Sequence, residues 1–160
     1  MITTLRLLAL LVTALLSGTS WGIWIGFNPV HFTATTYLEQ QQSLVLSLNK
    51  MMIAMAIFAT IVTLILAFLL RKNRTLFVAY LVAALCFIAC IIISRFGNLP
   101  IQNMMLDWKS DTLPANWTEL RDQWWKFHQF RTIAELIALL VICWASLQCI
   151  VKKDVLQNPL

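Results

Sequence analysis

The stretch "MMIAMAIFATIVTLILAFLLRKNRTLFVAYLVAALCFIACIIIS", residues 51–94, decides the fold of this chain. Residues 51–70 and 75–94 are both free of charged side chains, and each has about the length that crosses the hydrocarbon core of a bilayer. Because a backbone in lipid must satisfy its own hydrogen bonds, both segments are predicted to be transmembrane helices. The "RKNR" turn between them, residues 71–74, makes them an antiparallel hairpin.

Two further segments have the same character. Residues 132–151 are uncharged apart from Glu135, and residues 5–27 carry Arg6 only at their edge. The whole chain is 60% hydrophobic and 12% charged, whereas a soluble domain is about half apolar and about a quarter charged. The 160 residues are therefore predicted to form one membrane domain, an all-α bundle of four transmembrane helices.

Basic residues in short loops predict the orientation of the bundle. Those that would share one face are Arg6, Arg71, Lys72, Arg74, Lys152 and Lys153. The loops on the other face are residues 28–50 and 95–131, and acidic and basic residues are equal in number over residues 28–50 and over residues 95–130. Both termini are therefore expected on the cytoplasmic side of the cytoplasmic (inner) membrane. The net charge of +5 is explained by this asymmetry, and no nucleic-acid partner is expected.

The first apolar segment has two interpretations. Its stretch "RLLALLVTALLSGTS" has the basic start and the small residues of a cleaved signal peptide. However, apolar sequence continues through "WGIWIGF", and Gly18, Gly22 and Gly26 recur at every fourth residue. Such a face suits close helix contact in lipid, so we expect a retained helix that could also pair with a second copy of the chain.

The second helix is expected to begin outside the lipid. Thr36 and Glu39 have the spacing of a capping box, which predicts a helix that starts near Tyr37 and runs into the second span. The linkers "FNPVHFTA" and "RFGNLPIQNMMLDWKSDTLPA" are expected to be irregular. Together with the extended second and fourth helices they would form a small extracytoplasmic cap.

The fourth helix is expected to be longer still. Asn116 and Glu119 repeat the capping spacing, so a helix is predicted from Trp117 to about Val151. At about 1.5 Å per residue it would be roughly 52 Å long, beyond the core thickness of about 30 Å. Its outer part should therefore stand above the membrane.

The start of this fourth helix, "WTELRDQWWKFHQFRTIAEL" (residues 117–136), carries a polar and aromatic stripe. Arg121, Trp124, His128, Arg131 and Glu135 follow one another at steps of three and four residues. This is the spacing of a seam that faces partner helices. We therefore expect these side chains at the mouth of the bundle, beneath the cap.

Three members of the stripe are candidates for chemistry. Glu135 lies inside the apolar run, where a carboxylate marks a functional site by default. Arg131, four residues earlier, is its expected partner, in a functional or a purely structural ion pair. His128 could serve as a base near neutral pH. Trp124 and Trp125 have a second interpretation, as part of an interfacial aromatic belt.

Other site chemistries find little support in the sequence. The only histidines, His31 and His128, lie in different predicted loops without the spacing of a metal pair, so no metal site is expected. No glycine-rich phosphate loop is present, and no nucleotide cofactor is expected. The cysteines lie within predicted spans and are interpreted as core residues: Cys86, Cys90, Cys143 and Cys149.

The stretches "RFGNLPIQNMMLDW" and "PANWTELRDQWWKFHQFRT" resemble the signature of the anthrone oxygenase family of small four-span membrane proteins. The likeness extends over nearly the whole chain, including "TYLEQQQSLVLSLNKMM". The positions that match the family pattern are Asn98, Pro100, Asn103, Trp117, Arg121, Trp125, His128 and Arg131. The resemblance implies oxidation of anthrones to anthraquinones by molecular oxygen, without a metal or a flavin.

The stripe and the resemblance together give a site hypothesis. His128 would be the base, Arg131 with Asn98 or Asn103 would hold an oxyanion, and Glu135 would orient Arg131. The residues expected around a flat apolar ring, which could be anthrone- or quinone-like, are Trp117, Arg121, Trp124, Trp125 and Phe130.

Two readings without catalysis stay open on the sequence alone. In the first, the protein is a binding or assembly module for a lipid, a quinone or a protein partner. In the second it is a transporter or channel, although no pair of broken helices points to alternating access. The sequence therefore leaves open whether the protein is an enzyme.

Overall fold

The computed structural model describes the backbone of residues 1–157 and the side chains of residues 1–148. Cys149, Lys152 and Lys153, named above, lie outside the described side chains. The long helices are α1 (Ile2–Gly26), α2 (Ala34–Leu69), α3 (Arg74–Ile93) and α5 (Trp117–Gln157). The short elements are the 3-10 helix η1 (Pro29–His31), the π-helix η2 (Ser94–Asn98) and the helix α4 (Leu99–Leu106).

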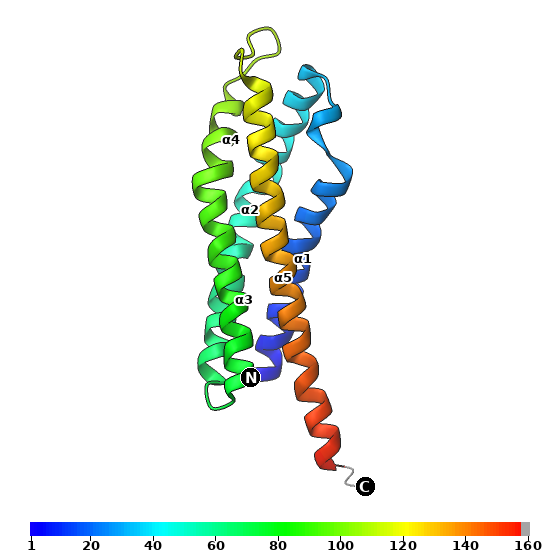
Figure 1. Cartoon of the computed structure of the whole chain (residues 1–160), viewed down its shortest axis with the longest axis vertical. Helices are drawn as coiled ribbons and strands as arrows, with labels where there is room; N and C mark the ends of the chain where they lie inside the picture. The colour runs from blue at the N-terminus through cyan, green and yellow to red at the C-terminus, as the bar shows by residue number, and fades with distance from the viewer. Residues whose placement is uncertain (158–160) are drawn as a thin grey trace.

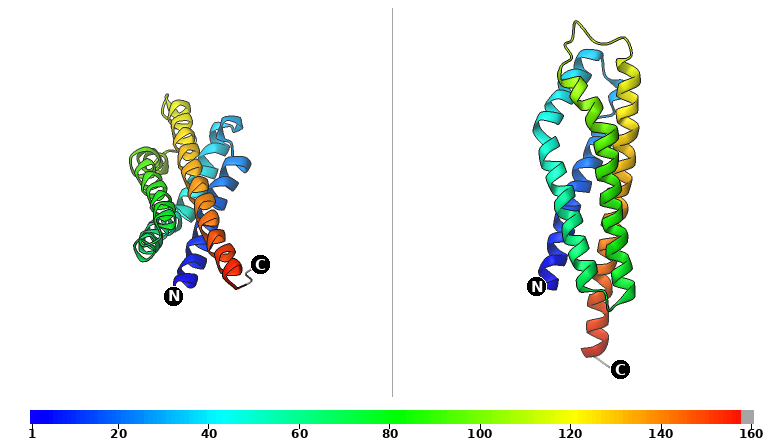
Figure 2. Two further views of the ribbon diagram at one scale, coloured as in Figure 1. Left: turned by 60° about the horizontal axis from the view of Figure 1, so that its bottom comes forward. Right: turned by 90° about the vertical axis from the view of Figure 1, so that its left-hand side faces the viewer.

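The long helices form an elongated bundle in which successive helices run antiparallel (Figure 1). α1 packs against α2 and α5, and α3 packs against the same two helices, so the four helices stand at the corners of a square. The views in Figure 2 show this arrangement obliquely, with the end that carries the N-terminus turned forward, and from the side. Within the described residues, four helical segments are long and apolar enough to cross a membrane. The predicted all-α four-span bundle is confirmed.

Alanines contribute to the axis of the bundle beside a few large side chains, while many large apolar side chains cover its outside. Ala59, Ala83 and Phe87 are fully buried, whereas Leu11 and Phe68 are 54% and 64% exposed. Small buried residues let helices approach closely, and an apolar outside is typical of a bundle in lipid. The outer surface is thus suited to acyl chains rather than to water.

The glycine face of α1 is not used inside the chain. A Cβ atom added at Gly18, Gly22 or Gly26 would find no neighbouring heavy atom within 4 Å. The three glycines therefore do not mediate packing of α1 against the other helices. The face is open, and its pairing with a second copy of the chain stays a prediction.

The helix α2 begins one turn earlier than the sequence indicated. Its N-cap is Thr33, whose Oγ1 accepts a hydrogen bond from the backbone N–H of Thr36 at 3.3 Å. The expected start near Tyr37 was therefore wrong. The capping spacing is present, but it is Thr33 to Thr36 rather than Thr36 to Glu39.

The cap residue gives a test of this helix start. We expect Thr33→Ala to lower the free energy of unfolding by about 0.5–2 kcal/mol, because the first turn of α2 loses its side-chain acceptor. The neighbouring Thr35 is exposed and makes no cap bond, so Thr35→Ala is the matched control. Denaturation in mixed detergent micelles measures both. Equal effects of the two substitutions would contradict the assignment of Thr33 as the cap.

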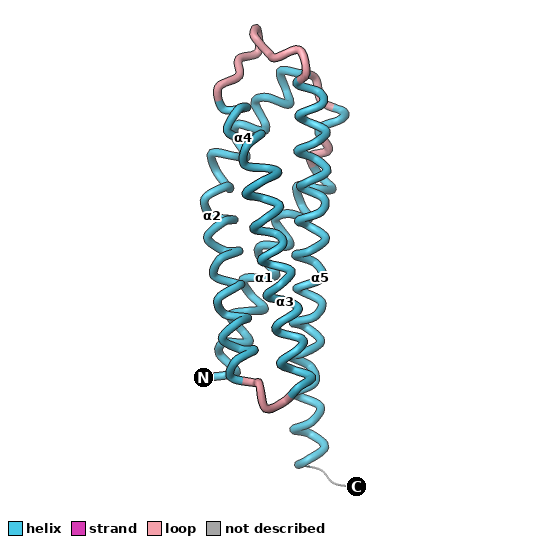
Figure 3. Tube along the Cα trace, turned by 60° about the vertical axis from the view of Figure 1, so that its left-hand side comes forward, coloured by secondary structure: helices cyan, strands magenta, loops and turns pink. Residues whose placement is uncertain are grey.

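The third transmembrane helix does not end at Ser94, as the sequence had suggested. It continues through η2 into α4 as one rod, and the irregular linker is reduced to residues 107–116 (Figure 3). Pro100 lies in the first turn of α4, where its missing N–H costs little. The π-turn of Ser94–Asn98 lets the rod pass the proline, since the backbone N–H of Leu99 bonds to the Ser94 carbonyl.

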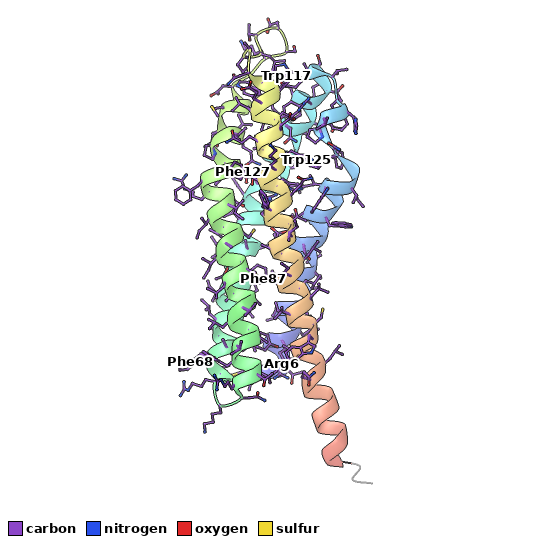
Figure 4. The ribbon with its side chains drawn as sticks, viewed as in Figure 1. Arg6, Phe68, Phe87, Trp117, Trp125 and Phe127 are labelled. Carbon is purple, nitrogen blue, oxygen red and sulfur yellow. The ribbon has the colours of Figure 1, made fainter. Side chains whose placement is uncertain are left out.

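Different elements form the two ends of the bundle. The N-terminus and the turn between α2 and α3 lie at one end, and α5 extends beyond that end (Figure 1). Arg6 and Phe68 mark this end in Figure 4. At the other end α4, η1 and the first turns of α2 and α5 form the expected small cap (Figure 3). The cytoplasmic location of the basic end stays a prediction.

Candidate functional site

The polar stripe of α5 faces the interior of the bundle, as its spacing predicted. The exposed fractions are 9% for Arg121, 3% for Trp124, 0% for His128, 8% for Arg131 and 1% for Glu135. Charged side chains are rarely buried in this way unless their polar atoms have partners. The hydrogen-bond partners of each buried side chain therefore determine which polar atoms of the stripe are left to bind a ligand.

His128 is held on both of its ring nitrogens. Arg131 donates its Nε–H to Nδ1 at 3.3 Å, and Nε2 lies 3.1 Å from the Ser20 carbonyl oxygen of α1. An arginine can only donate, so Nδ1 is the acceptor and Nε2 carries the hydrogen that the Ser20 carbonyl accepts. The ring also stacks on Trp124 and Trp125, with centroid separations of 5.3 and 5.4 Å. His128 thus links α5 to α1 and fixes the direction of Arg131.

Arg131 does not form the ion pair with Glu135 that the sequence predicted. Among the residues that the structure describes, Arg121 and Asp122 form the one ion pair within 4.0 Å. Arg131 is instead turned toward His128, and its Nη2 lies 3.9 Å from Met52 Sδ on α2. That sulfur contact is weak, so much of the donor capacity of the guanidinium is not used by the described protein atoms.

Glu135 has one satisfied and one unsatisfied oxygen. Its Oε1 accepts a hydrogen bond from the Cys90 thiol of α3, with a sulfur–oxygen distance of 3.0 Å. Its Oε2 is buried and makes no hydrogen bond of regular geometry. The Ser20 hydroxyl lies near this carboxylate but is itself without such a bond. A buried oxygen of this kind is costly, and it calls for a functional explanation.

Cys90 is a functional candidate that the sequence did not reveal. It was interpreted as a core residue, and it is indeed 2% exposed. Its contact with Glu135 joins residues 45 positions apart, so no local spacing could have shown it. The thiol holds Oε1 in place, while Oε2 makes no hydrogen bond of regular geometry.

A cavity of about 130 Å³ lies beside Arg131 and Glu135. Its walls come from all four long helices and from η2 and α4. The lining residues are Leu16, Met52, Ile53, Ala56, Cys90, Ile91, Ser94, Arg95, Leu99, Arg131 and Glu135. Apolar side chains form most of the wall, and the guanidinium and the carboxylate are its buried charges. His128 is not part of the wall.

The region directly under the cap, where the sequence placed the ligand-binding stripe, is filled by a buried cluster rich in aromatic side chains. The Tyr37 hydroxyl donates a hydrogen bond to Met105 Sδ at 2.8 Å, and the rings of Tyr37 and Trp117 lie 5.8 Å apart. Trp124 and Trp125 are buried in the same cluster. Figure 4 shows Trp117, Trp125 and Phe127 at this level of the bundle. The cavity lies further along α5, next to Arg131 and Glu135.

The predicted ligand-binding residues therefore separate into different places. Asn98 is buried and donates from Nδ2 to the Trp124 carbonyl at 3.0 Å, which ties η2 to α5. Arg121 lies over the Trp117 ring and pairs with Asp122 at 2.8 Å. Asn103, in contrast, is exposed on α4 and is not brought to the cavity. Phe130 and His31 are likewise exposed, which removes them from the site.

The described side chains offer no evident metal centre, since no group of three or more His, Cys, Asp and Glu residues is placed to hold an ion. Comparison with known proteins adds one finding. Residues 43–141, more than half of the chain, match the profile of the family described as anthrone oxygenase. No curated protein and no solved structure matches the chain. The matched range contains Cys90, His128, Arg131 and Glu135.

Proposed function

The chain belongs to the anthrone oxygenase family, and from this premise we propose that it is a membrane-embedded oxidoreductase. Its substrate is a flat, apolar aromatic compound, anthrone- or quinone-like, which it oxidises with molecular oxygen. The observation that carries the proposal is a buried carboxylate, Glu135, that lines an apolar cavity together with Arg131 and has one oxygen without a hydrogen bond of regular geometry. A base, an oxyanion partner and a dry pocket are what this chemistry needs from a protein.

The reaction is written for a methylene group that is conjugated with a ketone through the aromatic rings, as in an anthrone. Glu135 removes one proton through Oε2, and the negative charge moves to the carbonyl oxygen, which Arg131 stabilises. The carbanion carbon forms a bond to oxygen and gives a hydroperoxide after proton return. Loss of water from the hydroperoxide then leaves a second carbonyl group. The balance is one methylene plus one O₂ giving one ketone plus one water, so oxygen is the oxidant.

The contacts of the stripe favour Glu135 over His128 as the base. The Nδ1 lone pair of His128 is taken by Arg131, and its Nε2–H is taken by the Ser20 carbonyl. Glu135 is a wall residue of the cavity, and its Oε2 makes no hydrogen bond of regular geometry. His128 then acts as a positioning residue for Arg131, and Cys90 has the same role for Glu135.

Oxygen uptake by the purified protein tests the proposal. The protein is placed in lipid nanodiscs with anthrone, and O₂ consumption and ketone formation are followed together. We expect a rate above that of empty nanodiscs, with one O₂ consumed per ketone formed. Two results together would overturn the proposed reaction. Anthrone would be oxidised no faster than in empty nanodiscs, and other three-ring and two-ring ketones would also show no catalysed oxidation.

The role of His128 gives a second prediction. Replacing it by Gln should lower turnover by roughly 10-fold, because one hydrogen bond to Arg131, about 1.4 kcal/mol, is weakened rather than a reacting group removed. The shape of the pH–rate profile should stay that of the wild type, since the titrating base is unchanged. A loss above roughly 1,000-fold, with one limb of the profile gone, would instead make His128 the base.

A second candidate function, an assembly module, is favoured by the open glycine face of α1. We propose that this face pairs with a second copy of the chain. Gly22→Leu would then shift the protein toward monomers, measured by single-molecule photobleaching in bilayers. Ala54→Leu, at an exposed position of α2, is the matched control. A wild-type protein that is monomeric at all densities would rule out this pairing.

A further inference from the structure

The dimensions and the opening of the cavity indicate which kind of molecule it takes. We propose that its ligand is an amphiphile with a single aromatic ring and an apolar tail, which reaches the cavity from the bilayer between α2 and the α3–η2–α4 rod. The ring bears an acidic hydroxyl group. The inference rests on the proposed function in taking this cavity as the active site, and it adds lipid-soluble phenols and hydroquinones to the aromatic ketones as a second class of ligand.

The volume limits the part of the ligand that the cavity can enclose. A cavity of about 150 Å³ in another protein holds one benzene molecule. The present cavity, at about 130 Å³, therefore suits one aromatic ring. Any ligand with more than one ring, or with a chain attached, must extend out of it.

The exposure of the lining residues shows where the rest of the ligand can go. On one side the wall is closed, with Leu16 1%, Cys90 2% and Glu135 1% exposed. On the other side Ile53 of α2 and Leu99 of α4 are both partly exposed. α2 lies against both α3 and α4, and both residues line the same cavity, so we place its opening at the seam between α2 and the rod. The cavity thus opens sideways, within segments that are apolar enough to lie in lipid.

Charged residues set the depth of this opening. Arg95 belongs to the wall and is exposed, and its guanidinium lies 5.9 Å from the exposed ring of Phe96. Lys50 is exposed on α2 one turn before Ile53. Long cationic side chains in a lipid-facing position reach toward the headgroups. The opening therefore lies near the headgroup boundary, where the polar ring of an amphiphile resides.

An apolar path leads from the opening along the outside of the bundle. Ile57 and Ile61 follow Ile53 on α2 at steps of four residues, and they are 46% and 51% exposed. Ile88, one turn from the lining residue Ile91 on α3, is 36% exposed. A tail that leaves the cavity at Ile53 would run beside these side chains among the acyl chains.

The charges of the wall favour an acidic group on the ring. Two guanidiniums, of Arg95 and Arg131, face the cavity with the single carboxylate of Glu135, and none of the three takes part in an ion pair within 4.0 Å among the described residues. Transfer of a proton from a ligand to the carboxylate leaves the net charge of the site unchanged, but it moves the negative charge onto the ligand, beside the guanidiniums. A phenol hydroxyl can lose its proton to Oε2 and leave an oxyanion for Arg131.

Photolabelling tests the proposal without requiring turnover. The probe is 4-dodecylphenol with a diazirine midway along its tail, applied to the protein in phosphatidylcholine nanodiscs. After irradiation, adducts are mapped by mass spectrometry. We expect them on residues 53–61 and 88–99, and at least 5-fold fewer with excess unlabelled 4-dodecylphenol. Leu99→Trp and Ile53→Trp, which fill the opening, should lower labelling similarly, whereas Leu140→Trp, at an exposed site of α5, should not.

Two outcomes would overturn the inference. One is competed labelling at the cap, near Tyr37 or Trp117. The other is even labelling of all four helices that excess 4-dodecylphenol does not reduce. The result is independent of the oxygen assay: labelling at the seam without oxygen uptake would end the proposed reaction and keep the binding site. Oxygen uptake together with labelling at the cap would keep the proposed reaction and rule out the proposed binding site.

Discussion

Glu135→Gln is expected to lower turnover by about 10²–10⁴-fold, the range that a general base contributes. The substitution keeps the size of the side chain, and an amide oxygen can still accept the hydrogen bond from Cys90. What it removes is the ability of the second oxygen, which is buried and unsatisfied, to take a proton. Oxygen uptake in nanodiscs, measured at saturating substrate, gives the change in kcat.

Stability separates this effect from a loss of fold. A neutral amide costs less to bury than a carboxylate without an ion pair, so we expect Glu135→Gln to unfold at the same or a higher temperature than the wild type. Glu119, exposed in the first turn of α5, provides the control variant Glu119→Gln, which should keep full turnover. Wild-type turnover in Glu135→Gln would remove the carboxylate from the reaction.

The sequence was sufficient for the bundle because lipid imposes the strongest constraint. Charge-free runs of membrane length, such as residues 51–70, must be helical, and their number sets the number of spans. The inward direction of the α5 stripe was also predictable, because steps of three and four residues select one face of any helix. Both results depend only on local sequence.

The continuous third rod was not predictable, because Gly97 and Pro100 in "RFGNLPIQ" read as signals of a loop. The structure accommodates both within a helix. Pro100 occupies the first turn of α4, and Gly97 is the position at which η2 lies against Phe127 of α5. The glycine therefore marks a close approach between two helices, which sequence patterns alone do not distinguish from a turn.

The location of the site depended on contacts that spacing does not reveal. Residues four apart on a helix are neighbours, so an Arg131–Glu135 pair was a reasonable prediction. Other partners compete for both side chains: His128 accepts the Arg131 Nε–H, and the Cys90 thiol donates to Glu135. A ligand site beneath the cap was predicted from the inward-facing stripe, but Trp124 and Trp125 belong to the buried cluster that occupies that region.

The close approach at Gly97 leads to the second large effect. A Cβ atom added there would lie 2.6 Å from Phe127 Cγ and 2.8 Å from both Cδ atoms. These are the inner atoms of a ring held between two helices, so η2 and α5 must move apart. We expect Gly97→Ala to lower the free energy of unfolding by about 1–3 kcal/mol, the usual cost of overpacking. Denaturation in mixed micelles measures it.

A double-mutant cycle ties this cost to the contact itself. Phe127→Ala removes the ring, so the penalty of Gly97→Ala should shrink by about 0.5–3 kcal/mol in its presence. Gly18→Ala is the matched control, since its Cβ would meet nothing within 4 Å and an alanine favours the helix by up to about 1 kcal/mol. If Gly97→Ala proved as harmless as Gly18→Ala, the π-turn would not lie against α5. Because that turn carries Ser94 and Arg95 of the cavity wall, the opening between α2 and α3 would then lose its support.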